Sequence, residues 1–241
     1  MKKLLRILYQ PYKWLIFGPF LVCTTFLAGG LAVFSAALAG PKFASVFGII
    51  WARLNSLATP MLVETRGKEN ICPTQSYVIV SNHQSQYDIF VLYGWLGIDF
   101  KWVMKQELRK VPALGIACEK IGHIFIDRSN TAAALNSIND AKSKIVNGTS
   151  VIFFPEGTRS RDGNLGRFKK GAFKMALDLQ IPILPVTISG TRAILPTNSF
   201  DLFPGRACMT IHPPIESSGY DNRNLKSLMD ATRDIIASVP R

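Results

Sequence analysis

The chain has 241 residues, which is enough for one α/β domain with a short accessory segment and too few for two large domains. Lysine and arginine number 28 against 16 aspartate and glutamate residues, a formal charge of +12, so the natural partners are polyanions: nucleic acid, an anionic membrane surface or a phosphorylated substrate. The four cysteines lie far apart and no histidine has a second histidine or a cysteine at ligand spacing, which argues against a disulfide framework and predicts no metal site.

The first expected element is an apolar segment from Trp14 to Gly40, which contains no charged residue. A helix needs about 20 apolar residues to cross the roughly 30 Å hydrocarbon layer of a membrane, so this segment is long enough to span one. Three interpretations are open. The basic residues before it and Ala37-Leu38-Ala39 near its end resemble a secretory signal, although the apolar stretch is longer than usual. A single spanning helix is the second, and a re-entrant or interfacial helical pair that reverses at Gly29-Gly30 is the third.

A second helix is predicted directly behind this segment. Its apolar residues recur at helical spacing, and Ser45, Ala52, Asn55 and Ser56 fall on the other face. Such a stripe usually faces a protein core, and beside an apolar segment an interfacial helix is an equally good interpretation. The apolar stripe consists of Phe43, Val46, Phe47, Ile50, Leu54 and Leu57.

Residues 1–60 are therefore expected to form a membrane-associated helical segment, and residues 61–241 a separate domain. Basic residues on both sides of the apolar segment, Lys13 before it and Lys42 and Arg53 after it, favour both ends on the cytoplasmic face.

From about Met61 the pattern becomes that of an α/β domain, because short apolar or β-branched runs alternate with longer helical stretches. This alternation predicts a single domain with a mixed, largely parallel central sheet covered by helices on both faces. Ligands bind at the carboxyl ends of strands in such sheets, so the motifs that follow strands are the candidate site. The predicted strands are Tyr77–Val80, His123–Ile126, Ser150–Phe154, Ile183–Ile188 and Cys208–His212; the predicted helices are Asp88–Leu96, Thr131–Val146, Lys170–Leu179 and Asn224–Ala237.

The motif NHQSQYD, residues 82–88, follows the first of these strands. Asn82 is a good helix N-cap, so His83 is expected where the strand gives way to a helix. Side chains five residues apart on a regular helix point about 140° apart, so His83 and Asp88 can meet only if His83 lies outside the helix. If they meet, the carboxylate fixes the imidazole tautomer and stabilises the imidazolium form, as in a charge-relay pair. An ordinary loop histidine near an unrelated helix acid is the alternative.

Two further motifs follow strands. Arg128 ends GHIFIDR, residues 122–128, where it could pair with Asp127 or bind a phosphate through its forked N–H groups. In FPEGTRS, residues 154–160, Pro155 and Gly157 force a turn that either carries a surface ion pair or brings backbone close to a ligand.

A fourth motif and a basic cluster come later. IPILPVTI, residues 181–188, reads as a buried strand, in which proline is expected at a start, an edge or a bulge. The basic cluster is either a solvated face or a contact for anionic lipid head groups. It comprises Arg167, Lys169, Lys170 and Lys174.

In this order, the four motifs resemble the four sequence blocks of the glycerolipid acyltransferases, most closely the bacterial lysophosphatidate acyltransferases. The resemblance covers roughly Thr74 to His212 and extends to the apolar amino end. It implies that residues 61–241 form an acyltransferase catalytic domain. This domain would transfer an acyl group from acyl-CoA or acyl-acyl carrier protein to the sn-2 hydroxyl of lysophosphatidate, giving phosphatidate for phospholipid biosynthesis, without a further cofactor.

The same resemblance assigns residue roles. His83 would be the general base and Asp88 the group that orients it. No G-x-S-x-G sequence occurs in the chain, so the acceptor hydroxyl is expected to attack directly, without an acyl-enzyme. The implied substrate-binding residues are Lys105, Arg128 and Arg159 for phosphate, Glu156, Gly157 and Thr158 in the acceptor-binding turn, and Pro185 in the wall of the acyl pocket.

His123 departs from the content usual for its block and is expected to be a packing residue. The expected partners are lysophosphatidate, the acyl donor and an anionic membrane surface, with no nucleic acid. The expected location is the bacterial inner membrane, with the catalytic domain on its cytoplasmic face. Alternatives are another lysolipid or glycerol 3-phosphate as acceptor, a thioesterase that uses the same pair on water, and a basic module that binds lipid or nucleic acid.

Overall fold

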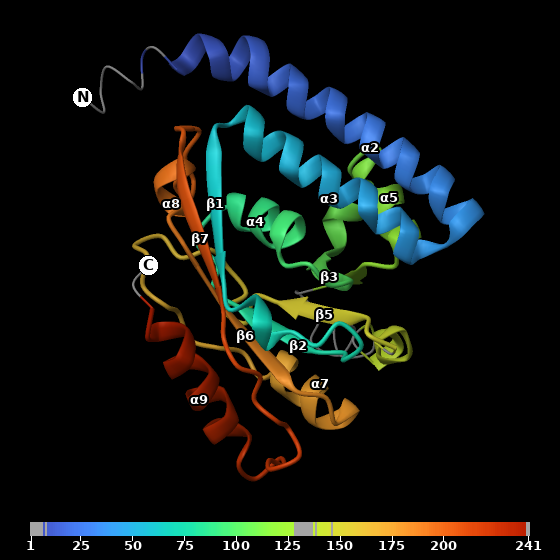
Figure 1. Ribbon diagram of the computed structural model, residues 1–241, viewed down its shortest axis with the longest axis vertical. Helices are drawn as coiled ribbons and strands as arrows, with labels where there is room; N and C mark the ends of the chain where they lie inside the picture. Colours follow the sequence, from blue (N-terminus) through green and yellow to red (C-terminus); the bar gives the residue numbers. More distant parts are fainter. Residues whose placement is uncertain (1–6, 8, 128–136, 138, 146, 240–241) are drawn as a thin grey trace.

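The structure, a computed structural model, describes residues 7, 9–127, 137, 139–145 and 147–239. A seven-stranded sheet in the order β1-β7-β6-β2-β5-β3-β4 runs through it (Figure 1). All neighbouring strands are parallel except β6 and β7, so the predicted mixed, largely parallel sheet is confirmed. The strands are β1 (Met61–Arg66), β2 (Val78–Ser81), β3 (Phe100–Lys105), β4 (Ile124–Ile126), β5 (Ser150–Phe153), β6 (Ile183–Ser189) and β7 (Gly205–Ile211).

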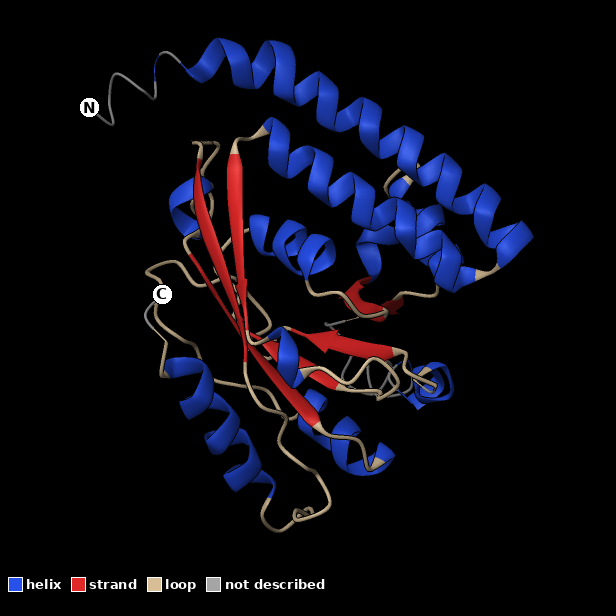
Figure 2. Cartoon of the chain, in the orientation of Figure 1, coloured by secondary structure: helices blue, strands red, loops and turns tan. Residues whose placement is uncertain are grey.

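Helices cover both faces of this sheet (Figure 2). Because side chains alternate along a strand, Ile79 of β2 packs into the core beneath α4 (Tyr87–Trp95), whereas Val78 and Val80 pack against α7 (Gly171–Leu179) and α9 (Leu225–Ala237). The α/β part also contains α5 (Leu114–Ile121) and the short α8 (Thr191–Ile194), with 3-10 turns at Lys68–Asn70, Gln106–Lys110 and Lys142–Lys144. The helix predicted at residues 131–146 lies largely outside the described residues.

The amino-terminal helix is continuous through the glycine pair. A π-helical stretch (Lys13–Phe17) leads into α2 (Gly18–Ala39), so the third interpretation, a helical pair that reverses at Gly29-Gly30, is wrong. Gly29 instead serves close packing, because a Cβ there would lie 3.2 Å from the carbonyl oxygen of Ala113. The reversal occurs at Gly40, whose φ of 87° places it in the region that favours glycine.

Residues Tyr9–Ala39 form a helix long and apolar enough to cross a membrane, and only 17% of its most apolar window is buried. This exposure distinguishes it from the core helix of a water-soluble protein. It packs against α3 (Pro41–Ala58) and α5, and Figure 1 shows α2 and α3 running side by side above the sheet.

The amphipathic helix α3 packs with its polar face inward. Asn55 is fully buried, and its Nδ2 donates a hydrogen bond of 3.1 Å to the Thr24 hydroxyl of α2. The apolar stripe does not face the core, so the interpretation of α3 as a core-facing helix is wrong. A row of large apolar side chains is exposed instead, which is typical of an interaction surface. The exposed members are Phe43, Val46, Ile50, Leu54 and Leu57, while Ala44, Ser45, Ala52, Asn55 and Ser56 are buried.

Candidate active site at the carboxyl ends of β2 and β5

The candidate site lies where two neighbouring parallel strands end. Val80 of β2 stands opposite Phe153 of β5, so the segments that follow these residues leave the sheet at the same edge. One segment carries His83 and the other is the FPEGTRS turn. The sheet therefore brings together two motifs that are about 70 residues apart in the sequence.

His83 and Asp88 meet where the loop after β2 joins α4. The distance from His83 Nδ1 to Asp88 Oδ2 is 2.8 Å, and 14% of the histidine side chain and 0% of the aspartate side chain are exposed. His83 lies outside α4 and Asp88 points back from its first turn, the arrangement that a charge-relay pair requires.

The neighbours of Asp88 indicate which imidazole nitrogen carries the proton. Asp88 Oδ2 also accepts the backbone N–H groups of Gln84 at 2.7 Å and Ser85 at 2.9 Å. A backbone N–H can only donate, so Oδ2 is an acceptor and we assign the neutral imidazole hydrogen to Nδ1. His83 Nε2 then carries the lone pair that a general base uses.

Thr191 holds the other oxygen of this carboxylate. Its hydroxyl donates to Asp88 Oδ1 at 2.5 Å, and both side chains are fully buried. Thr191 begins α8 after β6, which lies next to β2 in the sheet. The sequence gives no local sign of this contact, because the two residues are 103 positions apart; the order of the strands is the signal that reveals it.

The FPEGTRS turn fixes the main chain and the ring plane of His83. The His83 N–H donates to Glu156 Oε1 at 2.9 Å, and its carbonyl oxygen accepts the Ser160 N–H at 2.8 Å. The other carboxylate oxygen of Glu156 accepts the Gly166 N–H at 2.8 Å. The ring of Phe154 stacks on the imidazole with centroids 3.8 Å apart and planes inclined by 10°. The histidine is thus held from the backbone and from one ring face.

Asn82 has a role different from the one predicted. The amino-terminal cap of α4 is Gln86, without a side-chain hydrogen bond, so the prediction of Asn82 as N-cap is wrong. Its amide instead pairs with Ile188 of β6, donating to the carbonyl oxygen at 2.9 Å and accepting the N–H at 2.8 Å. The helix starts later because residues 82–85 form a loop tied to β6 and to Asp88.

The other predicted site residues are placed as follows. Gly157 turns the chain with a φ of 77°, and a Cβ there would lie 2.7 Å from Lys169 Nζ. Thr158 is exposed and Arg159 partly exposed on the same turn. Lys105 is exposed at the end of β3, which is parallel to β5 and so ends at the same edge. Arg128 lies outside the described residues.

Two further residues singled out from the sequence are buried in the sheet region. Pro185 lies within the central strand β6, paired with Val80, and not at the strand start or sheet edge expected for proline. His123 is 4% exposed, and its Nδ1 faces the Trp102 N–H at 3.3 Å. Burial, with a smaller contribution from the Lys101 charge, lowers the pKa of His123 to about 3, so it stays neutral, in agreement with a packing role.

The chain is similar in sequence to known acyltransferases. Residues 62–189 match the family model described as Acyltransferase. The chain is 35% identical over 198 residues to the chloroplastic 1-acyl-sn-glycerol-3-phosphate acyltransferase BAT2 of Brassica napus, covering 81% of this chain and 56% of the relative. It is 34% identical over 181 residues to the 1-acyl-sn-glycerol-3-phosphate acyltransferase alpha of Mus musculus, covering 74% and 64%. The chain thus spans between half and two thirds of the length of these relatives.

A solved structure matches the whole fold. The crystal structure of the 1-acyl-sn-glycerophosphate (LPA) acyltransferase PlsC from Thermotoga maritima superposes with a TM-score of 0.77 at 25% sequence identity. The match covers 100% of both chains, so it includes the two amino-terminal helices as well as the sheet.

Proposed function

The chain belongs to the Acyltransferase family, and from that premise we propose that it transfers a fatty acyl group from an acyl thioester to the sn-2 hydroxyl of lysophosphatidate, forming phosphatidate for phospholipid biosynthesis. The names of the relatives and of the matching structure support this substrate. The single observation that carries the proposal is the His83–Asp88 pair, held at the sheet edge with Nε2 available as a base.

In the proposed reaction, His83 Nε2 removes the proton of the acceptor hydroxyl as its oxygen attacks the thioester carbonyl. A C–O bond forms, the C–S bond breaks when the tetrahedral intermediate collapses, and the imidazolium returns its proton to the departing thiolate. Asp88 stabilises the imidazolium and keeps Nδ1 as the donor. The attack is direct, so no acyl-enzyme forms, and the reaction as proposed uses only the two substrates.

The remaining predicted residues keep their proposed roles. Lys105, Arg128 and Arg159 bind the acceptor phosphate, and Pro185 shapes the wall of the acyl pocket. Thr158 and Gly157 contact the acceptor from the turn. For Glu156 we add a positioning role, because both of its oxygens accept backbone N–H groups and one of these is that of His83.

The exposed apolar face of α2 and α3 supports a place at the membrane. Large apolar side chains on a surface are costly in water and favourable in a bilayer, and lysophosphatidate is itself a membrane lipid. The α2 helix packs on α3 and α5, contacts that a cleaved signal would not keep. We place the catalytic domain on the cytoplasmic face of a bacterial inner membrane, because basic residues stand on both sides of the apolar segment. The exposed apolar residues of these two helices include Leu27, Phe34, Leu38, Phe43 and Leu57, and Trp14 and Leu15 of the preceding π-helical stretch are exposed as well.

The test is to incubate the purified protein with labelled lysophosphatidate and a panel of acyl-CoA and acyl-acyl carrier protein donors, and then to resolve the lipid products. Labelled phosphatidate that requires both substrates is the expected result. Release of free fatty acid at the same rate without any acceptor would instead identify a thioesterase. Faster transfer to glycerol 3-phosphate or to another lysolipid would refute the assignment of the acceptor.

A further inference from the structure

A large basic groove lies beside the candidate active site. It has a volume of about 1340 Å³ and runs between the loop at residues 158–170 and the helix α9. Cations stand on both walls: Arg161, Arg167, Lys169 and Lys170 on the loop, and Lys226 and Arg233 on α9. The sequence alone shows the loop residues as a local run and gives no sign that α9 supplies an opposite wall.

The positive charge of this groove is not neutralised from within. Six cations and three carboxylates, Glu156, Asp162 and Asp230, line it, so its net charge is positive. Hydrogen bonds from Asn164 and Ser160 lower the pKa of Asp162 to about 2, so this carboxylate is counted as negatively charged. Arg233 donates to the carbonyl oxygen of Leu165 at 3.1 Å. Within the part of the chain that the structure describes, no salt bridge joins a carboxylate to the groove cations Arg167, Lys169, Lys170 and Lys226. A row of available cations on two facing walls suits a ligand with several anionic groups.

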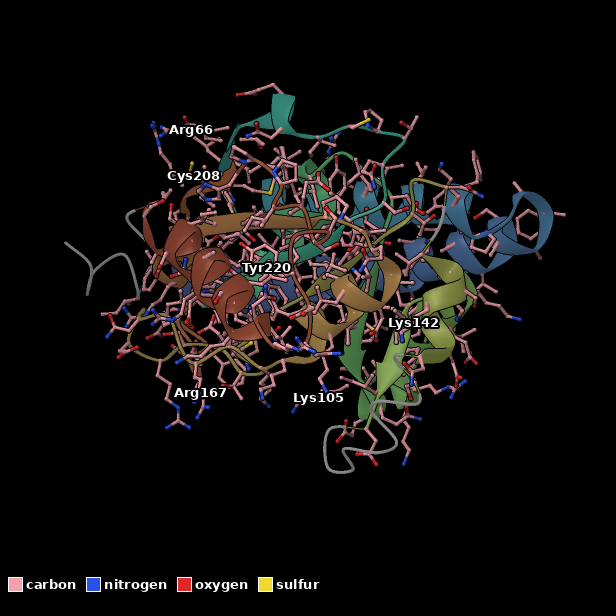
Figure 3. The ribbon with its side chains drawn as sticks, turned by 90° about the horizontal axis from the view of Figure 1, so that it is seen from below. Arg66, Lys105, Lys142, Arg167, Cys208 and Tyr220 are labelled. Carbon is pink, nitrogen blue, oxygen red and sulfur yellow. The ribbon has the colours of Figure 1, made fainter. Side chains whose placement is uncertain are left out.

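The groove adjoins the catalytic pair. Glu156 lines it and, through the same carboxylate, binds the N–H of His83. Figure 3 shows Arg167 of the groove and Lys105 of the candidate site along the same edge of the molecule in that view. His83 itself does not line the groove, so a ligand that lies there must extend past Glu156 to reach the imidazole.

We propose that this groove binds the phosphorylated nucleotide portion of the acyl thioester donor, while the thioester reaches His83. This inference rests on the proposed function. Coenzyme A carries a 3′-phosphate and a diphosphate, and phosphate groups are strong acceptors for arginine and lysine. The acceptor has a single phosphate, for which Lys105 and the FPEGTRS turn already provide cations.

Two other polyanions fit this surface less well. A bilayer would meet the apolar helices α2 and α3, which lie above one face of the sheet, whereas α9 packs on the opposite face (Figure 1). A folded acidic carrier protein meets a broad surface, whereas the facing walls of a groove fit a narrow ligand. The geometry therefore favours a nucleotide over lipid head groups or a carrier protein.

The experiment compares two donors with the same acyl chain, acyl-CoA and the acyl thioester of pantetheine, which lacks the nucleotide. The double variant Arg167→Gln/Lys226→Gln removes one exposed cation from each wall, and Lys68→Gln/Lys120→Gln is the control with two exposed lysines outside the groove. We expect the groove variant to raise the KM for acyl-CoA about tenfold or more, with kcat and the KM for lysophosphatidate unchanged. Its kinetics with the pantetheine thioester match those of the wild type, and the control variant matches the wild type with both donors.

Direct binding separates this proposal from the proposed function. Titration calorimetry with adenosine 3′,5′-bisphosphate needs no turnover, and we expect the wild type to bind it and the groove variant to bind it at least tenfold more weakly. Absence of acyl transfer by the wild type would refute the proposed function, and the calorimetry would still decide the groove. Three results for the groove variant would each overturn the groove assignment. The first is an unchanged KM for acyl-CoA, and the second is a KM that rises only for lysophosphatidate or only for acyl-acyl carrier protein. The third is a loss confined to the binding of phosphatidylglycerol vesicles.

Discussion

Replacing Asp88 with asparagine removes one negative charge and preserves the size of the side chain. The amide oxygen can occupy the place of Oδ2, where it still accepts the N–H groups of Gln84 and Ser85 and the Nδ1–H of His83. The amide nitrogen then faces the Thr191 hydroxyl, which can turn to accept. Asp88→Asn is therefore expected to fold and to hold the imidazole in place.

The expected loss is that of the charge interaction in the transition state. Two unit charges about 4 Å apart attract by about 4 kcal/mol at an effective dielectric constant near 20. The neutral amide cannot supply this attraction to the imidazolium that forms as the acceptor loses its proton. Since about 1.4 kcal/mol corresponds to a factor of ten, kcat/KM should fall by about a thousandfold.

The assay measures initial rates of labelled phosphatidate formation at several lysophosphatidate concentrations, with thermal unfolding followed by circular dichroism as the control for folding. A variant that unfolds at the wild-type temperature and retains more than a tenth of kcat/KM would refute the role of Asp88.

Three further predictions concern Thr191, His123 and the apolar face of α3. Thr191→Val removes a hydrogen bond to the buried carboxylate of Asp88 and should lower the free energy of unfolding by about 1.5–3 kcal/mol. Thr191→Ser keeps the hydroxyl and should retain most of the wild-type stability. Equal urea midpoints for the two variants would contradict this prediction. His123 has a pKa of about 3 in the folded protein, below the usual value near 6.5 of an unfolded chain, so the unfolded state binds more protons between these values. Its contribution to the free energy of unfolding is present above pH 6.5 and decreases by up to about 1.4 kcal/mol per pH unit as the pH falls towards 3. Urea titrations at several pH values should show that the free energy of unfolding of His123→Gln depends less steeply on pH in this range. An unchanged pH dependence would be inconsistent with a neutral buried imidazole. Phe43 and Leu57 are 53% and 66% exposed, so Phe43→Glu/Leu57→Glu should leave the unfolding temperature unchanged and weaken sedimentation with lipid vesicles at least tenfold; undiminished sedimentation would argue against a membrane-facing α3.

The sheet could be predicted from the sequence where its strands are apolar throughout, as in β2 and β5. Two strands were missed. In β1, at the sheet edge, exposed and partly buried residues alternate after Met61, and the apolar run ends at Val63, so it is too short to indicate a strand. In β3, Lys101 interrupts the pattern, although it is buried and paired with Asp99 at 3.2 Å. A charge that is neutralised by a neighbour cannot be recognised as a core residue from the sequence.

In the amino-terminal helices, the position of the chain reversal could not be predicted from the sequence. Gly29-Gly30 and Gly40 are both sites where a chain can reverse, and local propensity does not choose between them. The choice follows from packing, because Gly29 lies against Ala113 and Gly40 precedes Pro41, which begins α3. The outward direction of the α3 stripe likewise depends on which face α2 covers.

In the candidate site too, some contacts could be predicted from the sequence and others could not. The His83–Asp88 contact could be predicted from the spacing of five residues at the end of a strand, because His83 lies in the loop after β2 and Asp88 in the first turn of the helix that follows. The supports from Thr191 and Ser160 could not, since they depend on which strands are neighbours in the sheet. Asn82 was assigned to the nearest helix for the same reason, although its partner is Ile188 in a neighbouring strand.

The role of His83 as the base that activates the acceptor is most directly tested by the rate of phosphatidate formation in His83→Ala, with mass spectrometry of the intact protein during turnover. We predict that transfer falls by at least three orders of magnitude while the variant stays folded and bound to membranes, and that no acylated protein accumulates in the wild type. Transfer by His83→Ala within tenfold of the wild type, or an acyl-enzyme that forms and decays at the rate of turnover, would contradict it.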